Sequence, residues 1–178
     1  PDAGPFILDV EPGRTYRLRI VGAASLSYLN LNIDMHSMKI VEADASLVEP
    51  FTTQYVDIGQ GQTISAILRT YTVEELQKKA PGHSGNFWIQ TNIRHRATGP
   101  SGLAVLRYSS ANKTLPVAKP STEWPAWNDT AWSLKQARQY KSRHPVKVPS
   151  PDRRFVYLGT QNRLTDGRLA WALNNISY

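Results

Sequence analysis

The sequence has 178 residues, 40% of them hydrophobic and 20% charged, so it can bury a core and lacks the composition of a disordered chain. It contains no cysteine, which excludes a disulfide frame, a thiolate metal site and a cysteine nucleophile within this chain. The net charge of +7 is compatible with nucleic acid, a membrane surface or an acidic polysaccharide, but the basic residues are spread along the chain without a basic-aromatic motif. We therefore expect a solvated basic surface and no nucleic-acid partner. No apolar run approaches about 20 residues, so no transmembrane segment is expected.

Twelve prolines, eleven glycines and many aromatic residues favour short strands joined by turns. The first two strands are expected over residues 6–10 and 14–21, around the turn Glu11-Pro12-Gly13. In the second strand apolar and polar side chains alternate, which is the period-2 pattern of a strand with one buried face. Its apolar side chains are Tyr16, Leu18 and Ile20.

Further strands follow over residues 29–33, 38–41, 55–58, 63–68, 86–93 and 103–108. The glycines of Gly59-Gln60-Gly61-Gln62 permit the positive φ of a tight hairpin between the strands at 55–58 and 63–68. A short helix is expected over residues 72–79, where glutamates come early and lysines late, as the helix dipole prefers. Closely spaced short strands predict an all-β sandwich with this helix in an insertion.

Prolines are scattered through residues 109–151, and because proline cannot donate to a sheet ladder this segment predicts a connector. Within it, residues 128–140 predict a helix with Asn128 or Thr130 as N-cap. Trp132, Gln136 and Tyr140 share one side of this helix, which we expect to lie against a domain. A new strand is expected over residues 154–158, followed by a hairpin with Asp166-Gly167 as a two-residue turn.

Three N-glycosylation sequons, at Asn112, Asn128 and Asn175, stand in turn-like or terminal surroundings and favour a secreted protein. The alternative is that these triplets are unused chance matches. The start at Pro1 shows neither an initiator methionine nor a signal-peptide core, so a processed or excised piece is expected.

Most of the chain outside the connector resembles the multicopper oxidases, and within that family the plant ascorbate oxidases and laccase-like proteins. The matching runs are EPGRTYRLRIVGAASLSYLNLNIDMHSMKIVEADASLVEPF, VDIGQGQTISAILRT, NFWIQTNIRHR, GLAVLRY and RRFVYLGTQNRLTDGRLAWALNNISY. The resemblance implies a cupredoxin-like Greek-key β-sandwich. It assigns residues 1–110 to the second of three such domains with its first strands missing, 111–152 to the connector and 153–178 to the opening of the third domain.

The resemblance also implies a parent protein that couples one-electron oxidations of a reducing substrate, such as ascorbate or a phenol, to the reduction of O2 to water. Family members bind copper through a His-Cys-His set and His-x-His pairs, because nitrogen and soft sulfur donors suit copper. The four histidines here stand alone, so the copper of the parent is expected outside this chain, and His36 is expected to be a structural histidine.

Two residues are candidates for binding the reducing substrate. Trp171 matches the tryptophan that lines the substrate pocket of ascorbate oxidases, although a core or interface tryptophan is the alternative. Arg96 matches an arginine near that pocket, with His95 as a rival. Fungal-laccase specificity is not supported, because its acidic position falls near Leu26.

The competing hypothesis for the parent is a non-enzymatic cupredoxin-like cell-wall or matrix protein that has lost copper ligands. A carbohydrate-binding module would need exposed aromatic rings in a row. Trp124, Trp127 and Trp132 could supply them but are expected to fix the connector to a domain.

Overall fold

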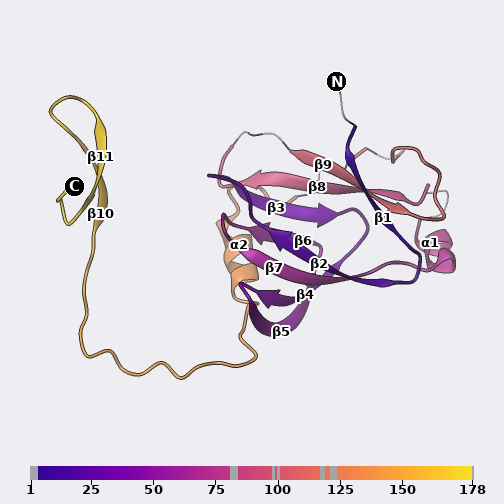
Figure 1. Cartoon of the computed structure of the whole chain (residues 1–178), viewed down its shortest axis with the longest axis horizontal. Coiled ribbons are helices and arrows are strands. Elements are labelled where there is room, and N and C mark those ends of the chain that lie inside the picture. The colour runs from indigo at the N-terminus through magenta and orange to yellow at the C-terminus, as the bar shows by residue number, and fades with distance from the viewer. Residues whose placement is uncertain are drawn as a thin grey trace. The chain divides into compact units, whose positions relative to one another are not determined.

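The structure, a computed structural model, describes residues 4–80, 84–97, 99, 101–116, 119–120 and 124–177. The chain divides into two compact units, Pro1–Pro145 and Val146–Tyr178. The first unit consists of two β-sheets that pack face to face (Figure 1). No helix in the described part of the chain is long and apolar enough to cross a membrane.

The chain passes between the two sheets several times, and the predicted β-sandwich is confirmed. The five-stranded sheet has the order β1 (Phe6–Val10), β9 (Gly102–Tyr108), β8 (Asn86–Arg94), β3 (Tyr28–Ile33) and β6 (Tyr55–Ile58). The four-stranded sheet has the order β2 (Thr15–Val21), β7 (Thr63–Arg69), β4 (Met38–Ala43) and β5 (Ser46–Thr53). The pair β1–β9 is parallel, and the other pairs within these two sheets are antiparallel.

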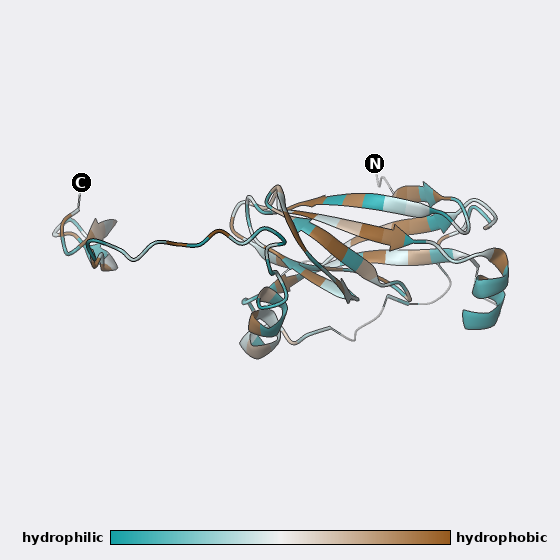
Figure 2. Ribbon diagram, turned by 90° about the horizontal axis from the view of Figure 1, so that it is seen from below, coloured by the Kyte–Doolittle hydropathy of each residue, from teal (hydrophilic) through white to brown (hydrophobic). Residues whose placement is uncertain are grey.

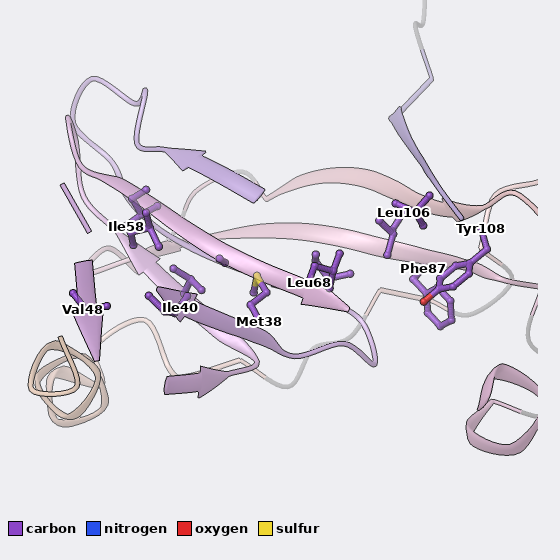
Figure 3. Packing of buried hydrophobic residues seen from close by; sticks show 13 residues of the cluster. Met38, Ile40, Val48, Ile58, Leu68, Phe87, Leu106 and Tyr108 are labelled. Atoms are coloured by element: carbon purple, nitrogen blue, oxygen red, sulfur yellow. The ribbon is translucent and has the colours of Figure 1, made fainter. Parts of the chain in front are cut away.

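The core lies between the sheets and follows the predicted period-2 pattern. Teal and brown segments alternate along the strands in Figure 2, and the alternating apolar residues of β2 pack against the core from the face opposite its arginines. Side chains from both sheets converge in Figure 3. The fully buried ones include Met38, Ile40, Leu68, Phe87, Leu106 and Tyr108.

The predicted hairpin around residues 59–62 is wrong, because β6 pairs with β3 whereas β7 pairs with β2 and β4. The loop instead carries the chain from one sheet to the other. Gly61 has the expected positive φ, at +73°. The structure also adds β5, which the sequence patterns did not indicate. Pro50 is tolerated there because β5 is an edge strand.

Both helices of the first unit begin at capping side chains. In α1 (Val73–Lys79), Thr72 and Glu75 form a capping box, and the charges follow the predicted order. In α2 (Thr130–Ala137), the N-cap is Asp129, whose carboxylate accepts from the Trp132 N–H at 2.9 Å. The predicted N-caps Asn128 and Thr130 are therefore wrong by one residue.

In the described residues of the second unit, β10 (Gly159–Arg163) and β11 (Leu169–Leu173) form one hairpin. The predicted strand at 154–158 is wrong, since these residues form neither strand nor helix and their side chains are exposed. The hairpin itself is confirmed, but its turn is longer than predicted: the Gly167 N–H donates to Leu164 O at 2.9 Å. Only Gly167 has a positive φ in this turn, whereas a two-residue type I′ turn needs two such residues.

Candidate functional site

A buried ion pair organises the outer face of the five-stranded sheet. Arg94 of β8 and Asp57 of β6 lie 3.3 Å apart, with side chains only 1% and 5% exposed. Asp57 also accepts from the Asn30 amide at 2.5 Å and from the Ser133 hydroxyl at 2.7 Å. The carboxylate is therefore paired and hydrogen-bonded, which is the condition for keeping a charge in an interior.

The same pair attaches residues 125–136 to the sheet. The Arg94 guanidinium donates to the backbone oxygens of Pro125 (2.9 Å), Ala126 and Asp129 (2.8 Å). The Gln136 amide accepts from the Asp57 N–H at 2.8 Å and donates to a β6 carbonyl at 2.6 Å. These contacts fix both α2 and the segment before it.

The prediction that one side of the helical segment lies against a domain is confirmed. Trp132 contacts Tyr55 with ring centroids 6.4 Å apart, Gln136 is buried, and Tyr140 packs edge-on against Phe51 at 5.0 Å. Trp124 also contacts Tyr55, at 6.0 Å. The segment is thus held by aromatic packing as well as by hydrogen bonds.

Beside this attachment the surface is hollowed to a volume of about 420 Å³, and Arg96 lies in its wall. Asn92, Trp124 and Trp127 also line it. Arg96 is exposed and makes no hydrogen bond or ion pair with any residue that the structure describes. A free guanidinium beside indole rings is suited to a small, flat anion.

The rival residue His95 is placed differently. Its φ is +59°, its N–H donates to Trp127 O at 2.7 Å, and its ring packs against Tyr28 at 5.4 Å. It does not line the hollow. Of the two neighbours, Arg96 is the one whose side chain is available to a ligand there.

Trp171 lies in β11 of the second unit, opposite Gln161 of β10. Its side chain is 76% exposed, and Leu169 and Leu173 on the same face of the strand are also exposed. Within the described residues it is therefore a surface ring and has no core position. Arg96 and Trp171 belong to different units.

The three histidines that the structure describes do not fit a copper site. His36 is buried, with Nδ1 2.7 Å from Asp34 O and Nε2 2.7 Å from the Tyr108 hydroxyl, so it is the structural histidine that we predicted. His95 and His144 are exposed, and His83 lies outside the described residues. Among the residues described, no three His, Cys, Asp or Glu side chains gather into a potential metal site. The described residues thus offer neither a cysteine thiolate nor the paired imidazoles of the family's copper sites.

The three sequon asparagines are exposed. Asn112 follows a turn, and its backbone oxygen accepts from the Asn86 amide at 3.0 Å. Asn128 directly precedes the N-cap of α2, and Asn175 has a φ of +67° and accepts from Asn162 at 3.1 Å. All three positions are open to a glycan.

The architecture is that of a cupredoxin-like β-sandwich followed by the hairpin of a separate unit. A family model described as multicopper oxidase matches residues 1–111. The chain belongs to the multicopper oxidase family, which confirms the resemblance read from the sequence.

Similar proteins extend the match over nearly the whole chain. An L-ascorbate oxidase of Cucumis sativus is 36% identical over 97% of this chain, covering 28% of that protein. An L-ascorbate oxidase of Nicotiana tabacum is 36% identical over 97% of this chain, covering 29% of that protein. The chain thus spans less than a third of the length of these relatives.

Two solved structures show the same fold. The laccase from Botrytis aclada superposes with a TM-score of 0.72 at 20% identity, over 96% of this chain and 29% of that one. Fet3p, a multicopper oxidase that functions in iron import, gives 0.72 at 19% identity, over 97% of this chain and 31% of that one.

Proposed function

We propose that this chain is a substrate-side segment of a secreted oxidase that couples one-electron oxidation of a reductant, of the ascorbate or phenol type, to reduction of O2 to water. The match to L-ascorbate oxidases along 97% of the chain carries the proposal. The copper of the parent protein would be bound by residues outside this chain, and the chain's own residues would bind and orient the reductant.

Residues 1–110 are proposed as the second cupredoxin-like domain, 111–152 as the connector and 153–178 as the opening strands of the third. The compact unit Pro1–Pro145 includes part of the connector, because α2 is fixed to the sheet by Arg94 and Gln136. Arg96 would then be presented by the second domain and Trp171 by the third.

Arg96 is proposed to bind the negative charge of the reductant. In the intact oxidase, Arg96→Gln should raise KM for anionic ascorbate about 10- to 100-fold, the scale of a lost hydrogen bond between charged groups. KM for a neutral phenol should change little. Arg19→Gln, which removes an exposed charge on the other sheet, is the matched control. Equal changes in KM for both substrates, or none for either, would refute this role.

Trp171 is proposed to stack on the reductant. Trp171→Ala in the intact oxidase should remove about 1 kcal/mol of stacking and raise KM about fivefold, with a small effect on folding. Steady-state kinetics beside thermal melts measure both quantities. A collapsed melting temperature with unchanged KM would make Trp171 a structural residue, since loss of a large core aromatic costs about 3–5 kcal/mol.

Secretion is proposed from the sequons, with glycan on Asn112, Asn128 or Asn175 of the native protein. Mass spectrometry of tryptic peptides from native material should find at least one of them modified. Three unmodified asparagines would count against a secreted protein.

A further inference from the structure

The basic residues are less evenly spread than the sequence pattern suggested. The 20 residues 135–154 contain seven of the 21 Lys and Arg residues of the chain and one of its 14 acidic residues, Asp152. The seven are Lys135, Arg138, Lys141, Arg143, Lys147, Arg153 and Arg154. The first four belong to the first unit and form what we call the basic ridge.

Different parts of the fold hold the two pairs of residues in the basic ridge. Lys135 lies in the last turn of α2 and Arg138 is its C-cap, so the two are i, i+3 neighbours on a helix fixed to the sheet through Gln136. Lys141 and Arg143 flank Ser142, which bridges to Val48 at the free edge of β5.

The bridge between Ser142 and Val48 also sets the direction of the Lys141 and Arg143 side chains. The Glu49 N–H donates to Lys141 O at 2.8 Å, and the Arg143 N–H donates to Leu47 O at 3.0 Å. Because side chains alternate along an extended strand and Val48 is buried, Lys141 and Arg143 both face outward. Lys141 and Arg143 are thus held by this bridge, as Lys135 and Arg138 are held by α2.

These four charges are not used within the protein. All four side chains are exposed, and none has an ion-pair partner among the described residues, although exposed Glu49 lies on the adjoining strand. By contrast, Arg14, Arg17, Arg69 and Arg107 in the same unit each pair with a carboxylate. Four unpaired cations within nine residues of the chain attract a partner that carries several anionic groups.

The aromatic side chains decide between kinds of polyanion. Proteins that bind single-stranded nucleic acid interleave cations with exposed rings on which bases stack. Tyr140 is the aromatic residue within 135–154, and it is turned inward against Phe51. The ridge therefore offers charge without a stacking platform, which fits a polymer that has anionic groups and no bases.

We propose that the basic ridge binds a linear acidic polysaccharide through Lys135, Arg138, Lys141 and Arg143. Binding depends on charge and therefore weakens as salt rises. It is independent of the oxidase activity, because the ridge shares no residue with the hollow at Arg96.

The test measures binding of this chain to polygalacturonate, heparin and oligo(dT) at matched concentrations of charge, over a range of salt. The ridge variant carries Lys135→Gln, Arg138→Gln, Lys141→Gln and Arg143→Gln. The control variant loses the same four charges elsewhere, through Arg19→Gln, Lys39→Gln, Lys78→Gln and Lys113→Gln. Circular dichroism confirms that both variants are folded.

We expect salt-sensitive binding to polygalacturonate or heparin that falls at least tenfold in the ridge variant and less than threefold in the control. Preference between these two polymers identifies carboxylate or sulfate as the bound group. Equal losses in both variants, or no binding by the unaltered chain, would overturn the proposal. Tighter binding of oligo(dT) than of either polysaccharide would also overturn it, in favour of nucleic acid.

Discussion

Replacing Arg94 by leucine is expected to lower the free energy of unfolding by about 3–5 kcal/mol. The substitution leaves the Asp57 carboxylate buried without its cation and frees four acceptors on the segment 125–133. Urea unfolding followed by tryptophan fluorescence measures the loss, since Trp132 lies on that segment and Trp124 directly precedes it.

A matched control separates the effect of burying an ion pair from the effect of removing a positive charge. Arg107 also pairs with an aspartate, Asp9, on the same sheet, but that pair is at the surface. Arg107→Leu should cost much less than Arg94→Leu, because water solvates the carboxylate that is left behind. Equal losses for the two variants would show that burial of the Arg94–Asp57 pair is not what holds the segment.

Raising the pH from about 10 to 12 is expected to remove about 2 kcal/mol of stability through Tyr108 alone. Burial raises the pKa of its hydroxyl to about 12. The folded state thus favours the protonated hydroxyl. Its contribution to the free energy of unfolding is fully present below about pH 10, the unfolded pKa, and is lost as the pH rises through the folded pKa. In the fold the hydroxyl donates to His36 and accepts from the Tyr71 N–H at 2.9 Å.

Tyr108→Phe isolates this effect from other groups that titrate in the same range. At neutral pH the variant should be less stable, because a ring nitrogen of His36 and the Tyr71 N–H lose their partner. The difference in unfolding free energy between the two proteins should then shrink between pH 10 and 12. A difference that stays constant over this range would contradict the raised pKa.

Sequence patterns predicted the features that depend on neighbouring residues. The alternation in β2, the order of acidic and basic residues in α1 and the inward side of α2 are each set within about ten residues, and the structure confirms them. The assignment of β6 and β7 to one hairpin failed because local glycines fit a hairpin and a crossing between sheets equally well.

The attachment of α2 could not be predicted for a similar reason. Asp57 and Arg94 are 37 residues apart, and they become neighbours only because a single strand, β3, separates β6 from β8 in the sheet. A polar residue at an outward position of a strand usually predicts a solvent-exposed side chain. Here the outward side chains of Asp57 and Arg94 are covered by residues 125–136. Arg96 could be proposed from resemblance, but its freedom from partners and its place in the hollow came from the structure.

We expect copper to be bound by the parent protein through residues outside this chain. Elemental analysis of the intact parent should find stoichiometric copper, and oxygen-electrode measurements on it should show O2 consumption with ascorbate or a phenol. The chain of residues 1–178, reconstituted with copper and desalted, should retain none. A parent without copper would instead support the non-enzymatic matrix protein, and stoichiometric copper retained by the chain alone would directly contradict a copper site outside it.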